Sequence, residues 1–161
     1  MNKLDKLNGE EALKMAISLE EQGLRFYQWA AGQIEDTAPS DMFRKFAEDE
    51  REHAKIFQGM VDTPESIQPL FDEEEAEAYL GALMKDTVFP DQCQWENRIE
   101  TLTDPVSIVN YAIQAEKDSI RLYTEMMIQA KVLAAKKTLR SIMGEEKGHL
   151  SKLEKYLSTL S

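Results

Sequence analysis

The sequence predicts an all-α protein in which two repeated helical hairpins pack as a bundle of four helices. Proline and glycine, the residues that interrupt helices, occur only 5 and 7 times among 161 residues. Apolar residues recur at alternating spacings of three and four along four long segments, as expected for one face of a helix. A shift of 96 residues aligns the two halves of the chain without gaps, which indicates an internal repeat.

The first half of the chain predicts two helices. One is expected to begin near Asn8, a residue type that caps helix N-termini, and to end near Asp36. We expect the segment 38–40, Ala-Pro-Ser, to break the helix. Its serine is then expected to cap a second helix that ends near Met60.

The middle of the chain is predicted to be a long crossover that contains a short acidic helix from Asp72 to about Lys85. Two hairpins that pack as a bundle need such a connection. The expected single domain, residues 1–161, therefore divides into a hairpin over 8–61, the crossover over 62–103 and a hairpin over 104–160.

The last part of the chain predicts the second hairpin. The third helix is expected to start at Thr-Asp-Pro, residues 103–105, because proline suits the first helical position. Helical sequence then continues to Leu160, and the stretch from Gln129 to Thr138 contains no glycine or proline. One helix of that length is implausible in a small domain. The repeat instead predicts a turn near residues 132–136, opposite the break in the first half.

The repeat includes the residues with the most distinctive chemistry. We call the row of apolar residues along one face of each predicted helix its apolar stripe. Each stripe has a carboxylate near its middle, and two of the four stripes also have an imidazole there. Both histidines of the chain follow a glutamate by three residues. The aligned pairs are Ala16-Ile17-x-x-Glu20 with Ala112-Ile113-x-x-Glu116, and Glu50-x-x-His53 with Glu146-x-x-His149.

Four carboxylates at one level inside a bundle need compensation, because a buried unpaired charge costs several kcal/mol. No lysine or arginine lies on any of the four stripes, whereas two divalent cations would balance four carboxylates. One glutamate from each of two helices, with Glu-x-x-His from each of the other two, is the di-iron ligand set of helical bundles. We therefore predict a site for two iron ions, with manganese or a mixed pair as alternatives. The candidate ligands are Glu20, Glu50, His53, Glu116, Glu146 and His149.

Two tyrosines lie two turns beyond candidate ligands. Tyr27 follows Glu20 and Tyr123 follows Glu116 on the same stripes. A tyrosine at stripe spacing is most often part of the core, and the alternative hypothesis is that it supports a ligand or carries a radical.

Composition narrows the classes of partner. The net charge of -11 argues against nucleic acid and anionic membrane surfaces. No apolar run is long enough to span a membrane, and the polar start shows no secretory signal. Cys93 is the only cysteine and is assigned no role. A single thiol fits a reducing compartment, so we expect a cytoplasmic protein.

The paired Ala-Ile-x-x-Glu and Glu-x-x-His motifs resemble the rubrerythrin branch of the ferritin-like superfamily. The resemblance covers both hairpins and implies a ferritin-like bundle. It also implies that Glu50 and Glu146 bridge two irons, with the other glutamates as terminal ligands and one histidine on each iron. Rubrerythrins typically carry a further glutamate three residues after the third-helix ligand, where this chain has Ser119.

The resemblance implies a non-haem di-iron peroxidase that reduces hydrogen peroxide; an oxidase that uses dioxygen is the related expectation. The alternative is an iron-sequestering protein with ferroxidase activity. Full-length rubrerythrins add a rubredoxin domain with four cysteines, which the lone Cys93 does not supply. Electrons are therefore expected from a separate donor such as a rubredoxin. The resemblance also implies a homodimer or a larger assembly.

Overall fold

Four long helices dominate the computed structural model, which describes residues 9–63 and 94–160. They are α1, Gly9–Gln33; α2, Thr37–Asp62; α6, Pro105–Gln129; and α7, Leu133–Thr159. The shorter pieces are α5, Gln94–Asn97, and a 3₁₀ turn, Ile99–Thr101. No strand occurs in the described residues. The all-α prediction is confirmed.

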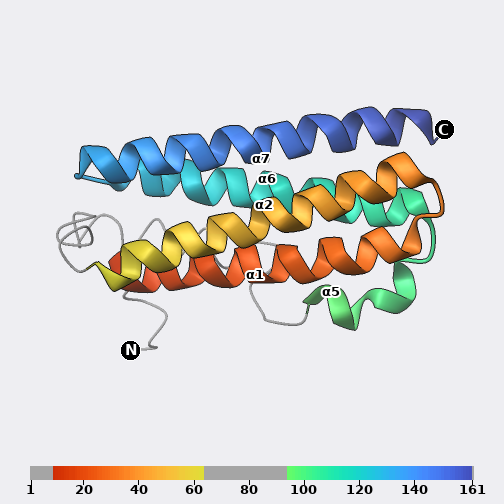
Figure 1. Cartoon of the computed structure of the whole chain (residues 1–161), viewed down its shortest axis with the longest axis horizontal. Helices are drawn as coiled ribbons and strands as arrows, with labels where there is room; N and C mark the ends of the chain where they lie inside the picture. The colour runs from red at the N-terminus through yellow and green to blue at the C-terminus, as the bar shows by residue number, and fades with distance from the viewer. Residues whose placement is uncertain (1–8, 64–93, 161) are drawn as a thin grey trace.

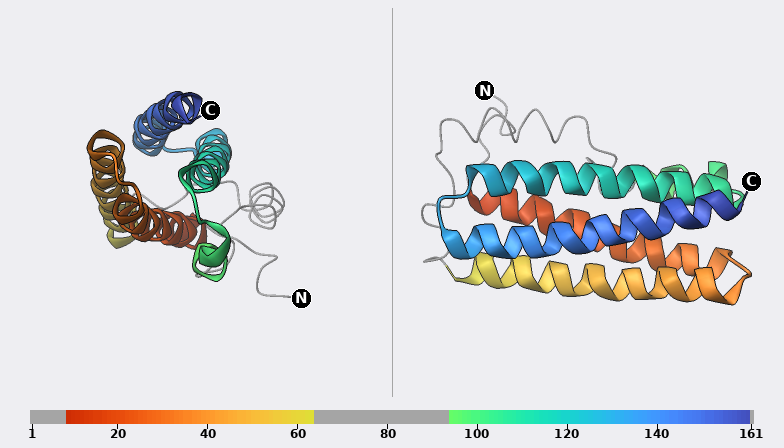
Figure 2. Two further views of the ribbon diagram at one scale, coloured as in Figure 1. Left: turned by 90° about the vertical axis from the view of Figure 1, so that its right-hand side faces the viewer. Right: turned by 90° about the horizontal axis from the view of Figure 1, so that it is seen from above.

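The helices pack as two antiparallel hairpins, α1 with α2 and α6 with α7, whose axes run nearly parallel along the molecule (Figure 1). Viewed along the bundle, α1 lies beside α6 and α2 beside α7, and α5 lies outside the bundle (Figure 2). The core between the hairpins is apolar at both ends and polar in the middle. None of the helices among the described residues has the length and apolar content needed to cross a membrane.

The helix boundaries repeat with the sequence. Helix α6 begins and ends 96 residues after α1, and α7 begins 96 residues after α2. Helix α6 starts as predicted, since Asp104 is its N-cap and accepts a hydrogen bond of 2.7 Å from the backbone N–H of Ser107. The Ser107 hydroxyl lies 3.3 Å from the backbone N–H of Asp104, which completes a reciprocal capping box.

The predicted break at residues 38–40 is wrong, because this segment forms the first turn of α2. Proline is tolerated there since the first backbone N–H groups of a helix have no partner within the helix. Ser40 is not the cap; it is buried, and its hydroxyl donates to the carbonyl of Ala31 at 2.7 Å. The turn predicted at 132–136 is displaced as well, because the repeat placed it opposite the misplaced break; α6 ends at Gln129 and α7 already begins at Leu133.

The predicted helix from Asp72 to Lys85 and residue Cys93 lie outside the described residues, as does the predicted cap Asn8. The division into one domain with hairpin boundaries at 61 and 104 stays a prediction.

Candidate metal centre

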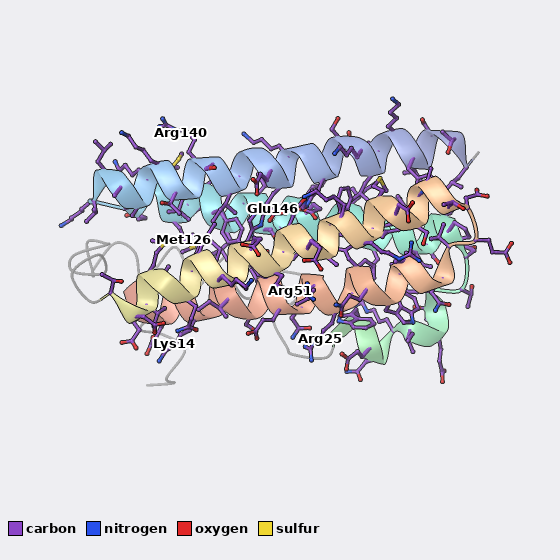
Figure 3. The ribbon with its side chains drawn as sticks, in the orientation of Figure 1. Lys14, Arg25, Arg51, Met126, Arg140 and Glu146 are labelled. Carbon is purple, nitrogen blue, oxygen red and sulfur yellow. The ribbon has the colours of Figure 1, made fainter. Side chains whose placement is uncertain are left out.

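The six candidate ligands all lie in the interior, near the middle of the four long helices. Each is at most 4% exposed, although an ionised carboxylate is among the groups least often buried. Figure 3 shows Glu146 directed from α7 toward the bundle, whereas Arg140 on the same helix points away from it. The structure therefore brings together every residue that the stripes predicted. The set is Glu20 from α1, Glu50 and His53 from α2, Glu116 from α6, and Glu146 and His149 from α7.

The six side chains form two overlapping groups. One consists of Glu20, Glu50, His53 and Glu146, and in the other Glu116 and His149 join the same two shared glutamates. Within each group, one potential ligand atom per residue lies within 4.8 Å of all the others. Two adjacent cation positions that share Glu50 and Glu146 fit this arrangement.

In each imidazole, Nδ1 faces the carboxylates. Nδ1 of His53 lies 2.8 Å from Oε1 of Glu146 and 3.4 Å from Oε2 of Glu20. Nδ1 of His149 lies 3.2 Å from Oε1 of Glu116 and 3.3 Å from Oε1 of Glu50. Nδ1 is therefore the nitrogen available to a cation in both groups.

The opposite ring nitrogen of each histidine contacts an acid from the other hairpin. Nε2 of His149 lies 3.0 Å from Oδ2 of Asp49, and Nε2 of His53 hydrogen-bonds Oε2 of Glu145. A carboxylate that accepts the second N–H of an imidazole fixes the ring and makes the first nitrogen a better ligand. Sequence reasoning missed Asp49 and Glu145. The available signal was that each precedes the glutamate of a Glu-x-x-His motif, and that the two are 96 residues apart.

The two tyrosines are also paired across the hairpins. The Tyr27 hydroxyl donates to Oε1 of Glu116 at 2.5 Å, and the Tyr123 hydroxyl donates to Oε1 of Glu20 at 2.6 Å. Both rings are buried, so each tyrosine contributes to the core and also orients a candidate ligand. Burial, followed by the nearby glutamates, raises the pKa of both phenols well above its usual value, which keeps them as donors.

The carboxylates destabilise one another's ionised forms. Burial raises the pKa of Glu50 and Glu116 well above its usual value, and repulsion from Glu146 adds to this. The histidines respond in the opposite sense. Burial alone would lower the pKa of His53, but hydrogen bonds to Glu146 and Glu20 outweigh it and raise that pKa to about 11. The pKa of His149 is raised to about 10 for the corresponding reasons.

The donor set fits cations in two further respects. Oε2 of Glu116 is buried without a hydrogen-bond partner, an expensive state for a carboxylate unless a cation contacts it. No lysine or arginine of residues 10–63 and 95–160 is buried, so none of those side chains neutralises the cluster from within the core. Iron-type or manganese-type ligation by oxygen and imidazole nitrogen matches these residues.

A small cavity adjoins the cluster between α1 and α6. Gly23 and Ser119, which occupy equivalent positions in the repeat, line it together with Ala115, Glu50 and Glu116. A Cβ atom on Gly23 would lie 3.2 Å from Oε2 of Glu50, so the glycine gives that carboxylate its room. The histidines and their outer acids lie on the α2–α7 side of the cluster, and the cavity lies on the α1–α6 side.

A four-helix bundle with a buried carboxylate–histidine cluster is characteristic of the ferritin-like diiron-carboxylate proteins. The family model described as Rubrerythrin matches residues 11–157, and the chain belongs to the rubrerythrin family.

A solved structure supports the same class. A Thermotoga maritima protein assigned to the ferritin-like diiron-carboxylate proteins is 29% identical in sequence, with a TM-score of 0.75. The match covers 97% of this chain and 98% of that one. Among curated proteins, none matches the chain.

Proposed function

We propose that the chain is a non-haem di-iron oxidoreductase that reduces hydrogen peroxide with electrons from a separate protein donor. The observation that carries the proposal is the pair of overlapping ligand groups, which share Glu50 and Glu146. Reduction of peroxide to water needs two electrons, and two adjacent irons can supply one each. We infer a cytoplasmic location from the single cysteine of the sequence, because a lone thiol fits a reducing compartment.

The side chains have distinct tasks in this proposal. Glu50 and Glu146 would hold both irons, while Glu20 with His53, and Glu116 with His149, would complete the two positions. Asp49 and Glu145 hold the imidazole rings so that Nδ1 faces inward.

Access and water exclusion follow from the surroundings of the cluster. The cavity beside Gly23 and Ser119 adjoins Glu50 and Glu116, so a molecule as small as peroxide would approach the cluster from this side. Large aromatic side chains cover the cluster on either side along the bundle, since Phe46 stacks on His149 at 4.1 Å and Phe57 packs against Tyr123 at 5.3 Å. Water is excluded there, which strengthens the electrostatic interactions within the site.

Iron sequestration with ferroxidase activity is the second candidate function. Ser119 and Gly23 favour it, because no carboxylate from either position reaches the cavity beside the cluster. If an additional carboxylate is needed to stabilise the oxidised centre, the protein would oxidise its iron once, and the centre would return to the reduced state only slowly.

Stopped-flow oxidation of the anaerobically iron-loaded protein distinguishes the two functions. We expect hydrogen peroxide to oxidise the centre faster than dioxygen, and repeated turnover when a reduced rubredoxin is supplied. Faster oxidation by dioxygen, with iron retained and no turnover, would establish the ferroxidase instead. Ser119→Glu should increase the rate of repeated peroxide turnover more than the rate of the first oxidation.

A further inference from the structure

We propose that Tyr27, Phe26, Trp29 and Trp95 form a one-electron relay between the candidate metal centre and the outer face of α1. The relay supplies the missing electron when peroxide reaches a centre that has only one electron to give. This inference rests on the proposed function, because it requires an oxidant at the centre.

The relay begins at the centre itself. Tyr27 donates a hydrogen bond to Glu116, so its phenol ring is directly connected to a candidate ligand. The Tyr27 ring lies 5.5 Å from the Phe26 ring in an edge-on contact. Both rings are buried, so no water separates the tyrosine from its neighbour.

Phe26 then connects Tyr27 with two indoles. Its ring centre lies 6.0 Å from Trp29 and 5.7 Å from Trp95, and the two indoles are 5.7 Å apart. Benzene rings are much harder to oxidise than phenols or indoles. Phe26 therefore serves as a bridge through which an electron tunnels, and the two tryptophans are the donors.

The outer end of the relay lies at the surface of the bundle. Trp29 is partly exposed, and Trp95 covers it from α5, the short helix outside α1 (Figure 1). Arg25 and Glu96 form an ion pair at 4.0 Å that joins α1 and α5 beside the indoles. A reductant in solution can thus reach the far end without entering the core.

The second half of the repeat lacks this connection. Leu122 and Glu125 occupy the positions equivalent to Phe26 and Trp29. Among the described residues, the ring contact of Tyr123 is to Phe57 alone. Leu122 fills its position in the core as completely as Phe26 does, so packing of the bundle does not require an aromatic residue there. Anchoring of α5 requires only an apolar surface on α1, with no ring contact to Tyr27.

The electron balance defines when the relay acts. Hydrogen peroxide takes up two electrons, together with two protons from solvent water, its O–O bond breaks, and two waters form. One electron comes from the centre and the second from Tyr27, whose phenolic proton moves along the hydrogen bond to Glu116. Tyr27 then regains an electron from the indole pair and its proton from Glu116. The oxidised indole is restored by a one-electron reductant of the thiol class, itself oxidised to a thiyl radical that pairs as a disulfide.

Electron paramagnetic resonance tests the relay. The protein is loaded anaerobically with one ferrous ion per chain, mixed with hydrogen peroxide and frozen within milliseconds. We expect a tryptophan radical, identified by the narrowing of its lines when deuterated tryptophan is incorporated. In Phe26→Leu, which copies the second half of the repeat, the tryptophan signal should fall at least tenfold. In Trp29→Phe combined with Trp95→Phe, a tyrosine radical should replace it.

Two controls distinguish this proposal from the function on which it rests. Leu122→Phe introduces the aromatic ring in the other half and should leave the tryptophan signal unchanged. Mass spectrometry should find oxidised Trp29 or Trp95 in the wild type and not in Phe26→Leu. Absence of any aromatic radical, while the fully loaded centre is oxidised normally, would overturn the relay and leave the proposed function intact. Failure of peroxide to oxidise the loaded centre at all would overturn both.

Discussion

At the scale of single residues, the two hairpins are connected through reciprocal polar contacts. Tyr27 of the first hairpin orients Glu116 of the second, and Tyr123 orients Glu20. Each histidine likewise contacts an acid from the other hairpin. The candidate ligands are thus held by the partner hairpin as well as by their own helices, so the site depends on how the two halves dock.

The outer acids should control metal affinity. Asp49→Asn and Glu145→Gln keep the side-chain size but remove the charge that accepts the Nε2–H, so each should weaken iron binding about 10- to 100-fold. Competition with a chelator of known affinity measures the change. Glu48→Gln is the matched control, because Glu48 adjoins Asp49 but pairs with Arg51 at the surface. Equal affinity for all three variants would contradict the role of the outer acids.

Gly23 should be needed for the position of Glu50. In Gly23→Ala, the new Cβ would lie 3.2 Å from Oε2 of Glu50 and 3.3 Å from its Cδ, so the carboxylate must move. Alanine favours helix over glycine by about 1 kcal/mol, yet we expect metal affinity to fall by about tenfold. Calorimetric titration with iron under anaerobic conditions measures it. Ser119→Ala alters the equivalent position without adding a Cβ and should retain the affinity.

At the scale of elements, some helix ends are fixed by the local sequence and others by contacts with another helix. Helix α6 carries its own start signal in Asp104 and Ser107. Helix α2 has no side-chain cap, and its first turn is fixed instead by Ser40, which reaches back to the carbonyl of Ala31 in α1. The turn between α6 and α7 contains no glycine or proline, so no residue type in it marks where one helix ends and the next begins.

The Asp104 cap predicts a pH-dependent contribution to stability. Hydrogen bonds from Ser107, its backbone N–H first, hold the pKa of Asp104 below its usual value. A folded-state pKa below the unfolded one adds stability at pH values above the unfolded pKa, and this stability is lost as pH falls through the folded pKa. Asp104→Ala should therefore melt about 2–4 °C lower at pH 7.

The variant Asp104→Asn distinguishes the contribution of the capping hydrogen bond from that of the negative charge. Asparagine can still accept the Ser107 N–H, so the variant should melt close to the wild type, and the difference between them should shrink toward pH 3. Thermal unfolding followed by circular dichroism across this range measures both variants. A difference that grows as the pH falls would contradict the assigned sign.

At the scale of the whole molecule, the interior combines an apolar core at each end with a charged centre. The ends provide the hydrophobic stabilisation, through side chains such as Leu13, Phe43 and Leu139. The centre opposes folding until its charge is compensated, since desolvation and mutual repulsion act on the same carboxylates.

Metal should therefore stabilise the fold. Iron at 100 times its dissociation constant would add about 2.7 kcal/mol and raise the melting temperature by roughly 5–10 °C. Anaerobic thermal unfolding with and without ferrous iron measures the difference. The double variant His53→Ala, His149→Ala should show a much smaller increase. Equal melting temperatures of the wild type with and without iron would contradict the two-metal site.

A homodimer stays a prediction from the resemblance. Light scattering across micromolar to millimolar protein should give twice the mass of the chain. A constant monomer mass over that range would rule out the dimer.

The sequence by itself determined the stripes, the repeat and the six buried candidate ligands, because helical periodicity places residues three and four apart on one face. It did not determine the start of α2, since a first-turn proline has the same sequence signal as a helix break. Only the tertiary structure decided that Asp49 and Glu145 meet the histidines, because each contact crosses between hairpins nearly 100 residues apart. The same holds for Trp95, which reaches Phe26 and Trp29 only because α5 folds back onto α1. Periodicity describes a helix's own faces, and contacts between helices depend on how those faces dock.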